Sequence, residues 1–180
     1  NGLGFKLLRG IPTEKYNIKQ SAAMYYGIGL HIGSPRSQNA KGHLLGHVKD
    51  LGLNIKNKNV RVYQTNERQN FHTDSSDVVG LLCLKEAKYG GISMLSSTIT
   101  VYNEFKLKFP NLLKYLFKPI SRDRRGEIPI GKKPYYNLPV LNWYKGKLTG
   151  VYHRGYIDSA LNYKDSIKIS KEHKLALDKF

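Results

Sequence analysis

His72, Thr73 and Asp74 are the residues whose types and spacing could most directly support chemistry. On a strand, side chains two residues apart point to the same side, so His72 and Asp74 could reach one ion while Thr73 points away. A mononuclear non-haem Fe(II) site takes two imidazoles and one carboxylate on one face of the metal. The motif supplies two of these ligands, or else it is the polar end of a strand whose histidine pairs with a neighbouring carboxylate.

Three other histidines are weaker candidates for a metal site. His43 and His47 are four residues apart and could share a helical face, as in zinc proteases. Leu44 stands where that motif has its glutamate, and the neighbouring glycines weaken a helix, so a separate zinc site is disfavoured. We expect His173 to be a surface residue of an exposed carboxyl-terminal helix.

The composition indicates a single globular domain over residues 1–180. The chain is 40% hydrophobic and 24% charged, and it contains no apolar run of the roughly 18 residues that span a bilayer. The first residues lack the pattern of a signal peptide. Cys83, the single cysteine, lies in an apolar run, which predicts core packing and favours a reducing compartment. We therefore expect a cytoplasmic protein without a membrane partner.

The formal net charge of +17 fits a nucleic-acid partner, an anionic substrate or a lysine-rich proteome. The lysines are scattered instead of forming long basic blocks. Tyr135, Tyr136 and Trp143 could stack on bases, but they alternate with prolines and apolar residues, as in core strands. Nucleic-acid binding is therefore the less favoured alternative.

Periodicity and turn signals predict helices at the edges of a strand-rich middle. We expect a helix over 13–30 ending near Gly27 and Gly29, a helix beginning at Ser97 or Thr98 that is interrupted at Pro110, and a final helix capped by Ser170. Strands are expected at 3–9, at 59–66, at 77–87 and after the Gly90–Gly91 turn. Several short strands separated by turns are expected between 120 and 157.

An ordered series of motifs resembles the taurine dioxygenase (TauD/TfdA-like) family of Fe(II)/2-oxoglutarate-dependent oxygenases. The series is His-Thr-Asp, an apolar strand, Lys-Glu-Ala, Gly-Gly with a hydroxyl residue, and a helix containing Tyr-Asn-Glu. It continues through "DRRGEIPIGKKPYYNLPVLN" and "GKLTGVYHRGYIDSA", and nearly the whole chain takes part. The central block is the most specific portion.

The resemblance implies a fold that is mainly β with flanking helices (α+β). The expected architecture is a double-stranded β-helix, the jelly roll of cupins and clavaminate synthase-like enzymes, incomplete in this chain. It further implies that His72 and Asp74 are iron ligands and that Ser93 donates a hydrogen bond to a 2-oxoglutarate carboxylate. Fe(II) and 2-oxoglutarate are the implied cofactor and co-substrate, and substrate hydroxylation the implied reaction.

The family's third ligand is a distal histidine, followed by an arginine that pairs with the co-substrate. His153 could be the third ligand, but its segment resembles a strand that precedes the distal motif. We expect that the chain begins inside the fold and stops before the distal histidine and arginine, so that this polypeptide alone lacks a complete site.

The implied partners are dioxygen and a small organic substrate. Arg68 and Asn70 precede the motif and are candidate substrate contacts, with Arg68 suited to an anionic group or to a structural ion pair. A homo-oligomer is compatible with the sequence. A catalytically silent jelly-roll binding module is the rival hypothesis, since it predicts the same fold without iron uptake.

Overall fold

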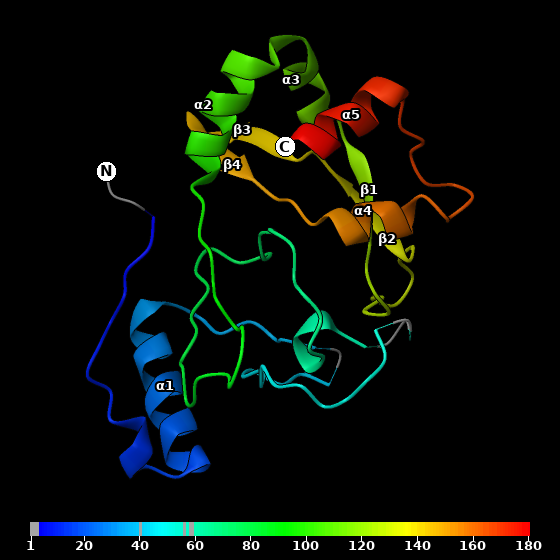
Figure 1. Cartoon of the computed structure of the whole chain (residues 1–180). Coiled ribbons are helices and arrows are strands. Elements are labelled where there is room, and N and C mark those ends of the chain that lie inside the picture. Colours follow the sequence, from blue (N-terminus) through cyan, green and yellow to red (C-terminus); the bar gives the residue numbers. More distant parts are fainter. Residues whose placement is uncertain (1–3, 40, 56, 58–59) are drawn as a thin grey trace. The chain divides into compact units, whose positions relative to one another are not determined.

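The structure is a computed structural model that describes residues 4–39, 41–55, 57 and 60–180 (Figure 1). Two compact units divide the chain. The first comprises Asn1–Gly46 and Ser76–Ser97, and the second comprises His47–Ser75 and Thr98–Phe180. Each unit therefore contains two separate stretches of sequence, and the His72-Thr73-Asp74 motif belongs to the second.

The first unit contains the 3₁₀ turn η1 (Thr13–Lys15) and the helix α1 (Ile18–Ile32). The expected helix was placed correctly but with wrong ends. Asn17 and Gln20 form a capping box, with both of its hydrogen bonds at 3.0 Å, so the helix begins after Asn17. It continues past Gly27 and Gly29, because an interior glycine costs a helix only about 1 kcal/mol and does not terminate it.

Residues 76–97 form an extended, largely exposed segment of the first unit, and the strands predicted at 77–87 and after Gly91 are wrong. The predicted strand at 3–9 is also absent over residues 4–9; residue 3 lies outside the described residues. A strand needs a hydrogen-bonded neighbour, and none of the described residues pairs with these segments. Cys83 is accordingly exposed, not packed in a core as expected.

The helices of the second unit agree well with the sequence. Helices α2 (Thr98–Lys108) and α3 (Pro110–Leu116) meet at Pro110, which starts α3 because proline suits the first turn of a helix. Helix α5 (Lys171–Lys179) is capped by Ser170, whose hydroxyl accepts a hydrogen bond from the His173 amide at 3.2 Å.

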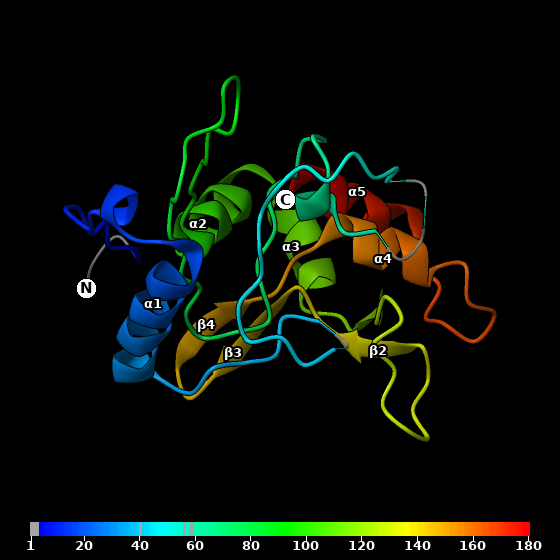
Figure 2. The same ribbon diagram turned by 90° about the horizontal axis from the view of Figure 1, so that it is seen from below.

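Two antiparallel hairpins complete the second unit. Strands β1 (Ile120–Asp123) and β2 (Tyr135–Leu138) pair with Ile120 opposite Leu138, and β3 (Leu141–Tyr144) pairs with β4 (Lys147–Gly150). Figure 2 shows the hairpin formed by β3 and β4. Lys145 and Gly146 have positive φ angles of 48° and 74°, as a two-residue hairpin turn requires. The strand-and-turn prediction for this region is confirmed up to His153, after which the chain forms α4 (Arg154–Ala160).

The predicted strand over 59–66 is wrong for residues 60–66; residue 59 lies outside the described residues. Val62–Gln64 form a 3₁₀ turn, η2. Gln64 folds back so that its side-chain oxygen accepts a hydrogen bond from the Arg61 amide at 3.0 Å. This local bond competes with an extended conformation.

The core of the second unit lies where α2, α3, α4 and α5 meet the two hairpins (Figure 1). Its fully or nearly fully buried residues are apolar: Phe105, Leu116, Ile120, Val140, Leu141, Ile157, Ala176 and Leu177. Burying the larger of these side chains contributes roughly 1.5–3 kcal/mol each, and the alanine contributes less. The described part of the chain therefore shows helices with two small antiparallel sheets, as an incomplete mixed domain would, and these residues do not themselves form the expected jelly roll. None of the described helices is long and apolar enough to cross a membrane.

His173 is buried, so its assignment to the exposed surface is wrong. Only 5% of the residue is exposed, and its ring centroid lies 5.9 Å from that of Tyr115. The hydrophobic face of α5 carries His173 into the core with Ala176 and Leu177, at helical spacing. Burial, with a smaller contribution from Lys118, lowers the pKa of His173 below its ordinary value.

This burial predicts a pH-dependent stability. The unfolded chain binds a proton at His173 below pH about 6.5, whereas the folded chain resists it, so the free energy of unfolding falls on acidification by at most about 1.4 kcal/mol per pH unit for this group. His173→Phe should flatten the dependence between pH 7 and 5. Urea unfolding followed by the fluorescence of Trp143, the single tryptophan, measures it in the second unit. An unchanged slope in this variant would contradict the assignment.

A buried arginine ties the two hairpins together. Arg122 is 1% exposed, and its Nη2 donates hydrogen bonds to the carbonyl oxygens of Pro139 and Val151. Replacing it with methionine keeps an unbranched stem but leaves both carbonyls without this donor, so Arg122→Met should lower the unfolding free energy by about 2–4 kcal/mol. Lys108→Met, which removes an exposed ion pair with Glu104, should change it by less than about 0.5 kcal/mol.

Candidate metal site

The His72-Thr73-Asp74 motif lies in an irregular segment, not on a paired strand as the sequence analysis assumed. It is docked through its middle residue. The Thr73 amide donates to the Tyr152 carbonyl oxygen at 2.7 Å, and the Tyr152 amide donates to the Thr73 hydroxyl at 2.8 Å. Thr73 is thus turned toward the protein, while the side chains of His72 and Asp74 lie near each other. The side chains of these three residues therefore still point alternately to opposite sides, as they would on a strand.

Tyr152 connects this docking point to the hydrophobic core. Its hydroxyl donates to the Leu177 carbonyl oxygen at 3.1 Å, and its ring packs edge-on against Phe180 with centroids 5.4 Å apart. The preceding residue, Val151, donates its amide to the Val140 carbonyl oxygen at 2.8 Å. The motif is therefore fixed to the best-packed part of the second unit, and it rests on residues about 80 positions later in the sequence.

The hydrogen bonds of His72 define which ring nitrogen is available to a metal. Nδ1 lies 2.9 Å from the Asn70 carbonyl oxygen, which can only accept, so Nδ1 carries the proton. Nε2 then has a lone pair, and the Gln69 side-chain amide nitrogen donates to it at 3.0 Å. A carbonyl bond to one nitrogen that leaves the other free to bind is the usual arrangement of metal-ligating histidines.

His72 Nε2 and Asp74 Oδ1 are 3.7 Å apart. With the proton on Nδ1, both atoms are acceptors, and two acceptors at this distance are stabilised by a cation between them. Ligand atoms bound about 2.1 Å from one ion are separated by about 3–3.7 Å, depending on the angle. The pair therefore fits one divalent ion, with Asp74 exposed and His72 half-buried beside it. A proton on Nε2 would instead give the plain ion pair of the alternative interpretation.

The structure brings His153 next to His72. The ring centroids of His72 and His153 are 5.2 Å apart with an interplanar angle of 55°, and the His153 ring also stacks on Tyr156, with centroids 3.7 Å apart and an interplanar angle of 15°. Burial, followed by the nearby His72, lowers the pKa of His153 to about 4, so this imidazole is neutral at pH 7. Its buried Nδ1 has no hydrogen-bond partner among the described residues.

Closeness alone does not make His153 a ligand. Among the residues that the structure describes, no three His, Cys, Asp or Glu side chains are grouped so as to hold a metal ion. Two ligands of the expected triad therefore come together here, and the identity of the third remains a prediction. His43 and His47 lie in non-helical segments, so they do not form the helical pair of a zinc protease.

The remaining predicted site residues are dispersed. Ser93 lies in the first unit, in the exposed segment after the Gly90–Gly91 turn, and its contact with 2-oxoglutarate remains a prediction. Arg68 and Asn70 are exposed on the segment that leads to the motif. Asn70 contributes its backbone carbonyl to His72, whereas substrate contact by either side chain remains a prediction. Tyr135 is only 7% exposed, as expected of a core strand, whereas Trp143 is 54% exposed, so its assignment to the core is wrong.

Sequence reasoning missed the supporting residues Gln69, Tyr152 and Tyr156. Gln69 is three positions before His72, but an exposed glutamine carries no signal of its own. Tyr152 and Tyr156 are about 80 residues away from the motif, and only the fold brings them to it.

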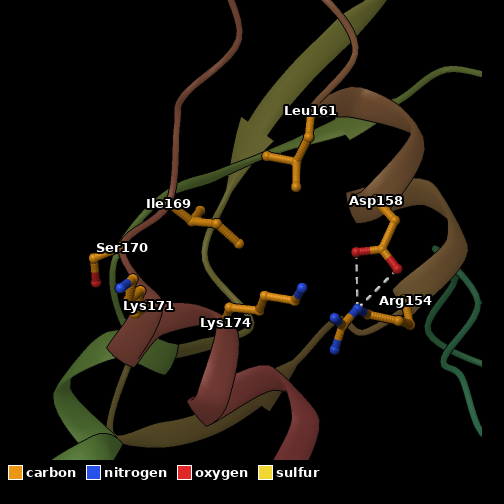
Figure 3. A pocket seen from close by; sticks show the side chains of 7 residues that line it. All are labelled: Arg154, Asp158, Leu161, Ile169, Ser170, Lys171 and Lys174. Atoms are coloured by element: carbon orange, nitrogen blue, oxygen red, sulfur yellow. Dashed lines mark hydrogen bonds and ion pairs between the residues drawn. The ribbon is translucent and has the colours of Figure 1, made fainter.

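A separate cavity of about 340 Å³ lies between α4 and α5, and His72 and Asp74 do not line it (Figure 3). Its wall contains Arg154, whose Nε donates to both carboxylate oxygens of Asp158 at 2.9 Å. Arg154 also pairs with Asp178 of α5. These ion pairs fix α4, the helix that begins directly after His153.

Comparison with known proteins agrees with the motif series. The sequence profile of the family described as "Taurine catabolism dioxygenase TauD, TfdA family" matches residues 1–180. The FR-33289 synthase of Streptomyces rubellomurinus is 35% identical over 182 residues, which cover the whole of this chain and 53% of that protein. The taurine hydroxylase-like protein SAT17 of Stachybotrys chartarum is 29% identical over 152 residues, or 81% of this chain and 38% of that protein. The chain spans about half the length, or less, of these curated relatives.

The docking of Thr73 gives a direct test of how the motif is held. Thr73→Val preserves the shape of the side chain but leaves the Tyr152 amide without its acceptor, which should lower the unfolding free energy by about 1–3 kcal/mol. Thr73→Ser retains the hydroxyl and should stay within about 1 kcal/mol of the parent. Urea unfolding followed by Trp143 fluorescence measures both. Equal losses in the two variants would show that the hydroxyl bond does not hold the motif.

Proposed function

Because this chain belongs to the TauD/TfdA family, we propose that it forms part of an Fe(II)- and 2-oxoglutarate-dependent dioxygenase. The reaction would hydroxylate a small organic substrate while 2-oxoglutarate is decarboxylated to succinate. The observation that carries the proposal is the pair of acceptor atoms, His72 Nε2 and Asp74 Oδ1, 3.7 Å apart on a motif docked to the core. Since the chain covers only part of its relatives, the activity is proposed for the whole protein.

His72 and Asp74 would hold the iron. A neutral imidazole and a carboxylate suit Fe(II), and two ligands on one side leave positions for co-substrate and dioxygen. When bound, Fe(II) together with 2-oxoglutarate would supply the electrons that reduce and so activate dioxygen. The Asn70 carbonyl keeps the proton of His72 on Nδ1, so that Nε2 presents its lone pair. Gln69 would leave Nε2 when the ion arrives.

The protein's other contributions concern binding and orientation. We propose that Ser93 donates a hydrogen bond to the distal carboxylate of 2-oxoglutarate, and that Arg68 and Asn70 contact the substrate. Arg68 would favour an anionic group. The third iron ligand would be His153 or a histidine outside this chain, and a jelly-roll fold would complete the site. Membership of the family supports the role of Ser93, a distal histidine and the jelly-roll fold, whereas Arg68 and Asn70 are proposed because they precede the motif in sequence. The relatives' names do not identify the substrate.

A catalytically silent binding module of the same fold is the second candidate. The observation that favours it is the lack of a three-ligand group among the described residues. Iron uptake separates the two candidates, because the silent module should bind neither Fe(II) nor its analogues at the motif.

Mn²⁺ provides the first test, since it takes oxygen and nitrogen ligands and broadens the NMR signals of nearby protons even when binding is weak. Titration with Mn²⁺ should broaden the ring protons of His72 before those of His31 or His43 in the first unit. Asp74→Ala should weaken this effect by on the order of 10-fold or more, because one of two ligands is lost. Asp77→Ala, which removes a nearby carboxylate outside the motif, should not.

A second measurement tests the co-substrate. Anaerobic addition of Fe(II) and 2-oxoglutarate should produce a weak visible metal-to-ligand band in a longer chain that carries the whole family domain. His72→Ala should abolish the band, and Ser93→Ala should raise the 2-oxoglutarate concentration needed for it by about 3–10-fold, the effect of one lost hydrogen bond to a charged group. A longer chain that gives no band, with no Mn²⁺ effect at His72, would favour the silent module.

A further inference from the structure

His72, His153 and Tyr156 form a continuous stack of rings behind the motif. His153 lies in the middle, 5.2 Å from the His72 centroid and 3.7 Å from the Tyr156 centroid. The stack is half-buried, and its residues come from the motif, from the residue before α4 and from the first turn of α4. The His72 ring is thus in contact with His153, while its Nε2 lies near Gln69 and Asp74.

Arg61 contacts Tyr156, at the end of the stack opposite to His72. Its Nη1 donates a hydrogen bond to the Tyr156 hydroxyl oxygen at 2.6 Å, and its guanidinium carbon lies 5.9 Å from the centre of the Tyr156 ring. Its Nη2 makes an ion pair with Glu127, in the connection between β1 and β2. The Arg61 side chain is only 20% exposed. Arg61 therefore links Tyr156 to a second element of the same unit.

His153 contributes to this arrangement through packing. Its buried Nδ1 has no hydrogen-bond partner among the described residues, and a Cβ added at Gly155 would meet the same edge of the ring at 3.6–3.7 Å, which is ordinary van der Waals contact. The His153 ring stacks face-on against Tyr156 and contacts His72 at a tilt of 55°. A ring that is fixed in this way limits the rotation of the His72 ring beside it.

We infer that His153 is a positioning residue that packs against the His72 ring and fixes its orientation, and that Arg61 holds His153 in place through Tyr156. The inference deepens the proposed function, because it assigns the support of one proposed iron ligand to residues that do not touch the ion. Its structural part concerns His72 and His153 alone and does not need the metal.

The structural part is tested by NMR on the whole chain without metal. Ring protons of His72 and His153 should show a nuclear Overhauser effect, which requires the two rings to be in contact. Arg61→Met and Tyr156→Phe each remove the hydrogen bond at the far end and should reduce this effect and shift the His72 ring signals. Arg124→Met is the matched control, because Arg124 also lies over a tyrosine, with its guanidinium carbon 5.1 Å from the Tyr136 centroid, but outside the stack.

Substitutions of His153 separate packing from ligation. His153→Phe keeps a flat ring without nitrogen, whereas His153→Ala removes the ring. If His153 acts by packing, the alanine variant should weaken the Mn²⁺ effect at His72 by about 10-fold, as is typical for residues that support metal ligands. The phenylalanine variant should retain binding within about 3-fold of the parent, which is a difference of roughly 0.7 kcal/mol.

Several outcomes would overturn the inference. These are unchanged His72 signals in Arg61→Met, an equal change in Arg124→Met, or a phenylalanine variant that binds as weakly as the alanine variant. The last result would make His153 a ligand through its nitrogen. If Mn²⁺ fails to affect His72 in the parent chain, the proposed metal site fails, and the ring contact and its loss in Arg61→Met still decide the positioning role.

Discussion

The pair of hydrogen bonds between Thr73 and Tyr152 is the constraint on which the site depends. These bonds join the segment that carries the motif to Tyr152. The hydroxyl and the ring of Tyr152 in turn contact the hydrophobic core. The two bonds also place His153, the residue after Tyr152, beside His72. Without them, a short irregular segment would have no reason to present His72 and Asp74 in one direction. The site is therefore built by long-range contacts, although its proposed ligands are neighbours in sequence.

The charge of this site differs from that of the chain as a whole. The chain has a formal net charge of +17, yet around His72 the structure gathers a neutral buried imidazole, a carboxylate and carbonyl or amide groups. Low local charge and a pair of acceptors favour a cation at this point. The guanidinium carbons of Arg61 and Arg125 each lie 5.9 Å from the centroid of the Tyr156 ring. The rings of His153 and Tyr156 separate Arg61 from His72.

Local features of the structure could be predicted from the sequence, and non-local ones could not. Pro110, Ser170 and the Lys145–Gly146 turn predicted their elements because each acts on its own few residues. The strand predictions over 77–87 failed because a strand depends on a partner that the apolar pattern does not specify. The motif correctly predicted that the side chains of His72 and Asp74 lie close together while that of Thr73 turns away from them, and their action as ligands stays a prediction. Nothing in the pattern predicted Tyr152, His153 or Arg61 as their support, or the burial of His173.

The most direct test of the central claim, that His72 and Asp74 bind iron, is to map the residues that bound iron oxidises. Fe(II) with ascorbate and dioxygen generates short-lived oxidants at the metal, and peptide mass spectrometry then locates the modified residues. The account predicts that oxidation concentrates at His72, His153 and Tyr156, and that Asp74→Ala removes this concentration. Oxidation spread over the surface, or centred on His43 and His47 and unchanged in Asp74→Ala, would contradict it.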